Sequence, residues 1–312
     1  MFGYVVRRIL LAIPTLLGVT FLIFAVVRLQ PGDPALVIAG EAATKEQLES
    51  LRRALGLDRP FWTQYLMFME GLLRGDLGRS IKTNEPVAPK VLQRFRHTIE
   101  LTLAAMVVAT SMGLLAGVLS AMHPYSWVDG LSMLGALFGV SIPVFWQGLM
   151  LMWVFALLLQ QWTGWGLPAT GRGTLAHLIL PAVALGTSSA AIIARMTRAT
   201  MLEVLRQDYI TTARAKGLPE WSVVYRHALK NALIPVLTIF GLQFGALLSG
   251  AVLTETVFAW PGVGRLIVEE GILPRDYPIV QGAILIVAVA FVMVNLCVDL
   301  LYGYIDPRIR YE

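Results

Sequence analysis

Six long runs without a charged residue constrain this sequence more than any other feature. The runs are Ile9–Val27, Leu101–Met122, Leu131–Leu159, Leu175–Ala194, Ala232–Thr254 and Tyr277–Val298. Each is near or above the ~20 residues that a helix needs to cross the hydrocarbon core of a bilayer. Because only 14% of the 312 residues are charged, against about 25% in soluble domains, the sequence predicts an all-α polytopic membrane protein with six transmembrane helices. The third run contains Pro143, so we expect that helix to tilt, kink or continue into the following loop.

The distribution of Lys and Arg predicts how these spans are oriented. One side of the predicted topology carries Arg7, Arg8, Arg195, Arg198, Arg206, Arg214, Lys216, Arg226, Lys230, Arg308 and Arg310. The other side carries Arg172, Arg265 and Arg275 in its short loops. Because cytoplasmic loops are enriched in Lys and Arg, we expect the first side, with both termini, to be cytoplasmic. Residues 28–97 are also basic and would lie outside, but this segment exceeds the ~60 residues within which the rule is reliable.

Residues 28–97 are polar enough to form an extracytoplasmic insert between spans one and two, and their pattern predicts helices. Thr44 and Gln47 fit a capping box at the start of a helix, and Gly56 suits its end. The apolar positions of that helix are Leu48, Leu51 and Leu55. Further helices are expected from Phe61 to near Gly75 and from Pro86 into the second span. The insert either caps the outer membrane surface, or it meets an external partner or gates the outer mouth.

A second polar segment, residues 199–231, connects spans four and five on the predicted cytoplasmic side. A helix is expected to continue from the fourth span through Leu202, Leu205, Tyr209 and Ala213, which repeat at helical spacing. Gly217 breaks it, and Pro219 suits the first turn of a second helix. That helix would present Trp221, Val224, Tyr225 and Leu229 on one face. The pattern leaves two alternatives, a docking surface for a second protein and an amphipathic helix on anionic lipid.

Motifs for catalysis or metal binding are absent from the sequence. It has no GxxxxGK[ST] phosphate-binding loop, HExxH, CxxC or GxSxG motif. The four histidines are far apart in sequence, and Cys297 is the only cysteine. We therefore predict no metal site, no cofactor bound by this chain and no enzymatic activity, and the predicted spans argue against nucleic-acid binding. Two GxxxG pairs, Gly113 with Gly117 and Gly135 with Gly139, are expected to permit close helix packing.

Several blocks of the sequence resemble a known family. TARAKG followed by HALKNALIP is similar to the cytoplasmic "EAA" loop of permease subunits of bacterial ATP-binding-cassette importers, in particular the dipeptide, oligopeptide, glutathione and nickel branch. The similarity extends along the chain through RRILLAIPTLLGVTFLIF, LQPGDPA, LGLDRPF, GDLGRS, GVSIPVFW, TETVFAWPGVGRL, RDYP and DPRIRYE. The general loop has Glu-Ala-Ala, three residues and then Gly, whereas this chain has Thr211, Thr212, Ala213 and Gly217 at those positions.

The resemblance implies a single transmembrane domain, residues 1–312, in the bacterial cytoplasmic (inner) membrane. It implies a second homologous permease, two ATP-binding-cassette ATPases that bind ATP and Mg, an extracytoplasmic solute-binding protein and membrane lipid as partners. The ATPase-docking residues expected from it are Asp208, Thr211, Thr212, Ala213, Arg214, Lys216, Gly217 and Glu220. Asp208 or Glu220 is a candidate to replace the missing Glu of the loop.

The expected cargo is short peptides, with glutathione, nickel or another small solute as alternatives. Ser141 and Phe145 flank Pro143 and can share a face near a kink, and Gln147 and Gln243 are polar groups inside spans. These four residues are the candidates for the translocation pathway. A secondary transporter without an ATPase and a membrane scaffold or sensor remain alternatives, although the inverted repeats and buried charges expected of a secondary transporter are not apparent.

Overall fold

The computed structural model describes residues 2–29, 34–39, 43–54 and 56–305, and within these ranges the chain is helical with no β-strand. Its internal contacts divide it into two compact units. Unit 1 comprises Met1–Val6, Thr98–Trp260 and Phe291–Glu312, and unit 2 comprises Arg7–His97 and Pro261–Ala290. The sequence-based prediction of one transmembrane domain over the whole chain stays a prediction.

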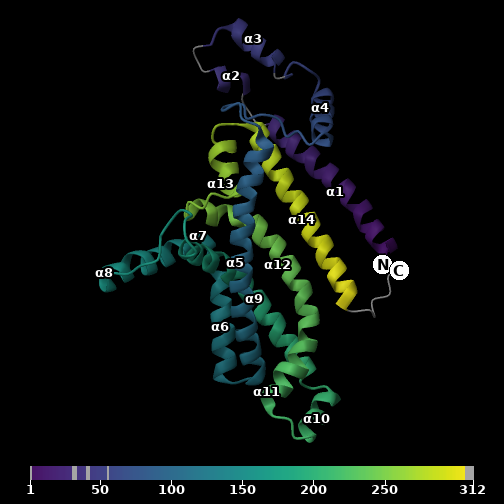
Figure 1. Cartoon of the computed structure of the whole chain (residues 1–312), viewed down its shortest axis with the longest axis vertical. Helices are drawn as coiled ribbons and strands as arrows, with labels where there is room; N and C mark the ends of the chain where they lie inside the picture. Colours follow the sequence, from purple (N-terminus) through teal and green to yellow (C-terminus); the bar gives the residue numbers. More distant parts are fainter. Residues whose placement is uncertain (1, 30–33, 40–42, 55, 306–312) are drawn as a thin grey trace. The chain divides into compact units, whose positions relative to one another are not determined.

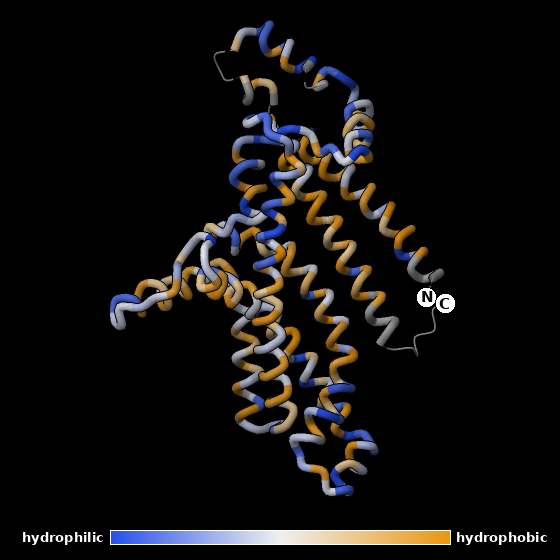
Figure 2. The backbone as a smooth tube through the Cα atoms, in the orientation of Figure 1, coloured by the Kyte–Doolittle hydropathy of each residue, from blue (hydrophilic) through white to orange (hydrophobic). Residues whose placement is uncertain are grey.

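Six helical segments are long and apolar enough to cross a membrane, which confirms the predicted number of spans. They are Arg8–Leu29, Val87–Met122, Val144–Thr163, Ala176–Val204, Glu220–Val257 and Tyr277–Val298. Five of them belong to the long helices α1 (Phe2–Leu29), α5 (Val87–Met122), α9 (Ala176–Val204), α12 (Leu229–Val257) and α14 (Tyr277–Ile305). Figure 2 shows these helices as largely hydrophobic tubes.

The third span differs from the predicted run because Pro143 ends one helix and begins another. Helix α6 (Trp127–Ser141) stops before Ile142, whose backbone is extended at φ −88° and ψ 127°. Proline disfavours helical backbone at the residue before it and lacks an N–H to donate. Helices α7 (Val144–Leu151) and α8 (Leu159–Thr163) follow, joined by the π-helical η1 (Met152–Leu158). In Figure 1, α6 lies beside α5, α7 lies at one end of α6, and α8 extends away from these helices.

Unit 2 contains the predicted insert, which is helical as expected. It includes α2 (Pro34–Ala39), α3 (Lys45–Ala54) and α4 (Phe61–Leu73). The capping box is present, because the Thr44 N–H donates to Gln47 Oε1 at 3.0 Å and the Gln47 N–H donates to Thr44 Oγ1 at 3.3 Å. Gly56 and Gly75 follow α3 and α4 with left-handed φ of 65° and 76°, and Leu55 lies outside the described residues.

Helix α4 packs on α1 through aromatic rings. Phe24, which is 1% exposed, has ring centroids of Phe61, Tyr65 and Phe68 at 5.3, 5.4 and 5.6 Å. Each such pair contributes about 0.5–1.5 kcal/mol beyond the burial of its area. These contacts place part of α4 against the first span, whereas Trp62, Leu66 and Leu73 of the same helix are 63%, 65% and 85% exposed. Unit 2 also contains α13 (Val263–Leu266) and the π-helical η3 (Ile267–Ile272).

Glycines hold α5 and α9 close together within unit 1. A Cβ added at Gly117 would lie 2.6 Å from Thr197 Cβ and 2.7 Å from the Ala194 carbonyl oxygen. A Cβ at Gly113 would lie 2.7 Å from Ile193 Cβ. These distances are shorter than real Cβ contacts, so the two backbones approach as closely as they do only because glycine is present. The packing role predicted for this GxxxG pair is confirmed.

The cytoplasmic segment of the sequence prediction forms short helices at one end of unit 1. Helix α9 stops at Val204, the backbone turns, and α10 (Asp208–Ala215) begins. The prediction of one continuous helix through Ala213 was therefore wrong. The turn brings the apolar side of α10 onto the core, which a straight extension of α9 would carry away from it. Gly217 ends this region at φ 73°, as predicted.

The second predicted helix begins after Pro219 as α11 (Glu220–Ser222) and continues as the π-helical η2 (Val223–Ala228) into α12. Its predicted apolar face was wrong, because Val224 is 1% exposed whereas Trp221 and Tyr225 are 66% and 53% exposed. A π-helical turn has more residues per turn than an α-helix. It therefore changes which side chains face the core, and here Val223 and Val224 do so together.

Candidate functional site

Helix α10 packs on the body of unit 1 through one side. Ile210 and Ala213, 0% and 7% exposed, belong to a buried cluster that also includes residues from α5, α9, η2 and α12. The other members are Val118, Ala121, Met201, Val223, Val224, Ala228 and Ala232. Because Ile210 and Ala213 are three residues apart, they lie on one face of the helix. This burial holds the short helix in place although it has only two turns.

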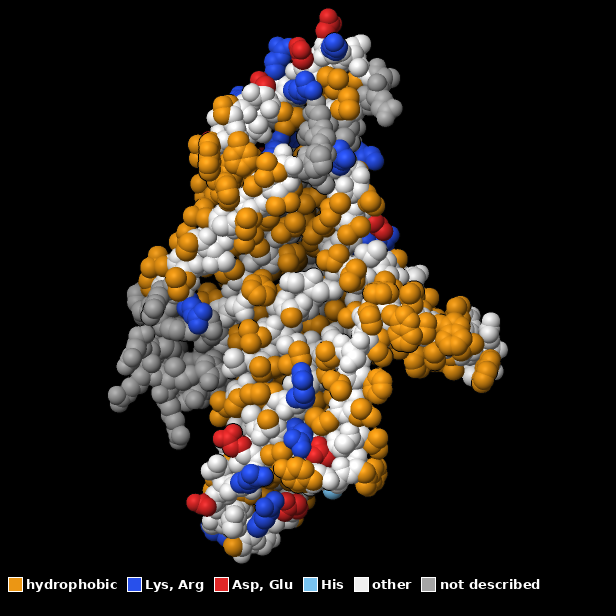
Figure 3. All heavy atoms as spheres, turned by 180° about the vertical axis from the view of Figure 1, so that it is seen from behind, with side chains coloured by type: hydrophobic (Ala, Val, Ile, Leu, Met, Phe, Trp, Pro, Cys, Tyr) orange, Lys and Arg blue, Asp and Glu red, His pale blue; other side chains and the backbone are white. Residues whose placement is uncertain are grey.

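The opposite side of α10 and the loop after it are exposed. Seven of the eight predicted docking residues are on this surface, namely Asp208, Thr211, Thr212, Arg214, Lys216, Gly217 and Glu220. Ala213 is the exception, because it faces the buried cluster. Figure 3 shows that Lys, Arg, Asp and Glu side chains gather at this end of the chain. We call these seven exposed residues the α10 surface.

An ion pair closes the loop between α10 and α11. Arg214 donates from Nε to Glu220 Oε2 at 3.2 Å and from Nη2 to Glu220 Oε1 at 2.6 Å. This fork bridges the left-handed turn at Gly217. Both side chains are about half exposed, so the pair contributes about 0–1 kcal/mol to stability. Its larger effect is geometric, because it fixes the position of the acid that follows the loop.

A second ion pair lies at the same end of unit 1 and is more buried. Asp129 on α6 is 6% exposed and accepts from Arg198 on α9, with Nε to Oδ1 at 2.8 Å and Nη2 to Oδ2 at 2.7 Å. Ser120 Oγ on α5 also donates to Oδ1, and the Tyr125 N–H donates to Oδ2 at 3.0 Å. The bonds from Arg198 and Ser120 hold the pKa of the Asp129 carboxyl well below its usual range.

Asp129 was not among the site residues predicted from the sequence. The sequence features that could have indicated this ion pair are an acidic residue just before an apolar run and Arg198 near the end of another span. Sequence alone does not show that the two ends adjoin. In the structure, the carboxylate receives donors from α5, the α5–α6 turn and α9, so it fixes three segments at one point.

The four pathway candidates lie on three helices of unit 1. Ser141 and Phe145 are exposed on either side of Pro143, where α6 ends and α7 begins. Gln147 on α7 accepts a hydrogen bond from Thr187 Oγ1 of α9 at 2.8 Å. Gln243 is half-buried in α12. The first three thus lie within residues 141–147 around the break at Pro143, whereas in the described part of the chain no hydrogen bond joins Gln243 to them.

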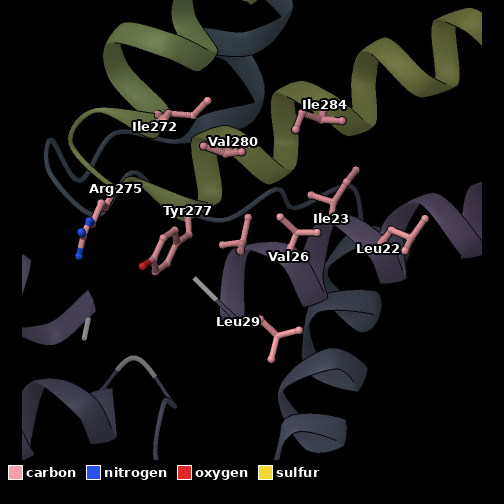
Figure 4. Close-up of a pocket in the computed structure, with 11 residues that line it drawn as sticks. Leu22, Ile23, Val26, Leu29, Ile272, Arg275, Tyr277, Val280 and Ile284 are labelled. Atoms are coloured by element: carbon pink, nitrogen blue, oxygen red, sulfur yellow. The ribbon is translucent and has the colours of Figure 1, made fainter. Parts of the chain in front are cut away.

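Unit 2 contains an apolar cavity of about 670 Å³ that no sequence prediction anticipated. Its walls come from α1, η3 and the start of α14, and Figure 4 shows Leu22 and Ile284 toward one end and Arg275 and Tyr277 at the other. The remaining lining residues are Ile23, Val26, Val27, Leu29, Gly271, Ile272 and Val280. Such a lining offers few hydrogen-bonding groups to a polar solute, so we do not assign the cavity to the pathway.

Comparison with known families identifies the kind of protein that has this arrangement. Residues 113–311 match the family model described as "Binding-protein-dependent transport system inner membrane component". Residues 1–102 match the model of the N-terminal part of such membrane components. The chain belongs to this family. It is therefore a multi-pass membrane component of a binding-protein-dependent transport system, and a transporter subunit, not an enzyme.

Curated relatives of this permease match over the full length of both chains. The dipeptide transport system permease protein DppB of Alkalihalophilus pseudofirmus is 50% identical, and the protein of that name in Escherichia coli K12 is 44% identical. The glutathione transport system permease protein GsiC of Escherichia coli K12 is 45% identical. Each alignment covers 100% of this chain and 100% of the relative.

Solved structures show the same fold at low sequence identity. Two inward-facing forms of the MetNI methionine ABC transporter match with TM-scores of 0.56 and 0.57 at 17% and 18% identity. The matches cover 69% and 70% of this permease and 96% of the other chain in each case. Together with the six helical segments long enough to span a membrane, these matches confirm the all-α, six-span fold predicted from the apolar runs.

Proposed function

We propose that this permease forms half of the translocation pathway of an ATP-driven importer for short peptides. The observation that carries the proposal is the 50% identity to a dipeptide permease over the full length of both chains. A second, homologous permease would supply the other half, and an extracytoplasmic solute-binding protein would deliver the peptide. Two ATPase subunits would bind ATP and Mg and supply the energy.

In this proposal the α10 surface is where an ATPase docks. Its support is mechanical: the exposed residues sit on a short helix whose other side is held by Ile210 and Ala213 in a buried cluster shared with α5, α9 and α12. A push on α10 is therefore transmitted to three spans at once, because packed interiors deform little. Glu220, fixed by Arg214, is the acid nearest to the turn and replaces the missing Glu of the loop.

The same proposal assigns sides to the membrane. Residues 199–231, the coupling loop, and both termini face the cytoplasm, as the excess of Lys and Arg on that side indicates. Residues 28–97 form the extracytoplasmic insert. The pathway runs beside the break at Pro143, and it is lined by Ser141, Phe145, Gln147 and Gln243. A kink in a span exposes backbone carbonyls that a polar solute can use.

Glutathione is the second candidate cargo, because a glutathione permease is 45% identical over its full length. Uptake of a radiolabelled dipeptide should fall at least tenfold in a host strain that lacks this gene, and plasmid-borne wild type should restore it. Excess unlabelled dipeptide should compete with the label, whereas glutathione should not. Unchanged dipeptide uptake in the deletion strain, with glutathione uptake lost, would exclude the peptide assignment in favour of the second candidate.

Gly217→Val tests the turn of the coupling loop. The position has φ 73°, which disfavours a β-branched residue by about 1–3 kcal/mol, yet a Cβ there meets nothing within 4 Å. We expect normal amounts of the variant in the membrane but at least tenfold lower ATP-driven uptake. Gly164→Val is the matched control, because Gly164 has φ 74° and equally free space after α8. If both variants transport peptide at the same rate, the turn at Gly217 has no special part in coupling.

A further inference from the structure

We propose that the turn between α5 and α6, residues 123–126, is a second contact for the ATPase, and that the cleft between this turn and α10 receives an acidic side chain of that subunit. The inference rests on the proposed function and extends the α10 surface to a part of the chain that carries no Lys or Arg. Because its sequence, HPYS, lacks the basic residues that mark the coupling loop, the turn has no signal of its own in the sequence.

The cleft lies between the α5–α6 turn and the α10 surface. It has a volume of about 430 Å³ and lies within unit 1. One wall is the turn, from Ala121 to Tyr125, and the opposite wall comes from the end of α9, α10 and η2. Its polar lining residues are His123, Tyr125, Arg206, Arg214 and Glu220. Two of these, Arg214 and Glu220, belong to the α10 surface, so the cleft continues that surface without a gap.

The turn is held in a backbone conformation that is energetically unfavourable at one residue. Tyr125 has φ 60° and is 85% exposed. The left-handed region costs a residue with a Cβ about 1–2 kcal/mol. The cost is offset by Asp129, which accepts from the Tyr125 N–H, and by Ser126, whose Oγ donates to the His123 carbonyl at 2.5 Å. The backbone of the turn, including that of its exposed tyrosine, is therefore held in place before any partner binds.

The charges that line the cleft favour an acidic occupant. Arg214 is already paired with Glu220. Arg206 is exposed, and within the part of the chain that the structure describes no acidic side chain lies within 4.0 Å of it. Among the Arg and Glu side chains of the lining, one positive charge is therefore in excess. A carboxylate entering the cleft would meet Arg206 and exchange water for a charge-assisted hydrogen bond.

The shape and composition of the cleft favour a protein over a lipid as the source of that carboxylate or phosphate. The cleft has apolar lining residues as well, but at about 430 Å³ it is too small for the two acyl chains of a phospholipid, and Arg214 and Glu220 form part of its wall. Tyrosine and arginine are, in contrast, among the side chains enriched in protein interfaces. Binding of anionic lipid is the alternative outcome of the experiment below.

Photocrosslinking in the complete transporter tests the contact. The photoreactive amino acid p-benzoylphenylalanine would be introduced at Tyr125, at Thr212 on α10 and at Trp162, an 84% exposed residue of α8 that serves as the control. We expect ATPase adducts from positions 125 and 212 and none from 162, identified by mass spectrometry. If position 212 gives an ATPase adduct but position 125 gives only a lipid adduct, or none, this inference is overturned and the proposed function is left intact. No ATPase adduct from either position would overturn both.

Charge reversal tests the occupant of the cleft. Arg206→Glu should weaken binding of purified ATPase to the reconstituted permease pair at least tenfold, and added salt should reduce the difference. Arg226→Glu is the matched control, because Arg226 is also exposed at this end but does not line the cleft. Equal affinity of the two variants would contradict an acidic occupant, whatever the crosslinking shows.

Discussion

Asp129→Asn is expected to destabilise the isolated permease by on the order of 3 kcal/mol, the lower end of the cost of breaking a buried ion pair. The lower end applies because the Arg198 side chain is 26% exposed. The carboxylate receives two donors on each oxygen, from Ser120 and Arg198 on one and from Arg198 and Tyr125 on the other. An asparagine NH₂ group would face two of these donors in either orientation.

The measurement is thermal unfolding of the detergent-solubilised chain, where this loss corresponds to a midpoint shift on the order of 10 °C. Glu100→Gln is the matched control. This substitution removes the negative charge of a second arginine–carboxylate pair on α5. In that pair, Arg172 donates to Glu100 Oε2 at 3.0 and 2.8 Å. Those side chains are 39% and 36% exposed, so the control should cost about 0–1 kcal/mol. Equal shifts in the two variants would show that Asp129 does not hold the three segments together.

Gly117→Ala is expected to cost about 1–3 kcal/mol although it adds a single methyl group. The new Cβ would lie 2.7 Å from the Ala194 carbonyl oxygen, which belongs to a helix backbone and cannot rotate away. Helices α5 and α9 must therefore separate next to the cluster that holds α10. We expect a lower unfolding midpoint and, in the complete transporter, less peptide imported per ATP hydrolysed.

Gly135→Ala makes the same chemical change where the structure has room. Gly135 is exposed on α6, and an added Cβ meets nothing within 4 Å. Alanine is also favoured over glycine in helix interiors by up to about 1 kcal/mol. This variant should therefore be as stable as the wild type or slightly more stable. A destabilisation of Gly135→Ala equal to that of Gly117→Ala would mean that the α5–α9 approach is not the cause.

The spans were predictable because burial in lipid demands a long apolar run, and this demand appears directly in the sequence. The same holds for local rules: Thr44 and Gln47 form the predicted capping box, and Gly217 has the left-handed backbone expected of a helix stop. In each case the residues that decide the structure are neighbours in sequence.

Features that depend on distant segments were not predictable in this way. The helix predicted through Ala213 is interrupted after Val204, because α10 packs on residues of α5 that are far away in sequence, as well as on η2. The face predicted for the next helix assumed α-helical periodicity, whereas the π-helical turn buries Val223 beside Val224 and leaves Trp221 and Tyr225 exposed. Asp129 was missed for the same reason, since its importance comes from its contact with Arg198.

The central claim is that this permease moves peptides only when an ATPase acts on the α10 surface. The most direct measurement is uptake of a radiolabelled dipeptide into proteoliposomes that hold the transporter purified through a tag on this chain, with binding protein and dipeptide outside and ATP inside. We expect uptake that requires hydrolysable ATP, falls at least tenfold in Gly217→Val and is unchanged in Gly164→Val. Uptake of equal rate without ATP, or by the chain reconstituted alone, would contradict the account.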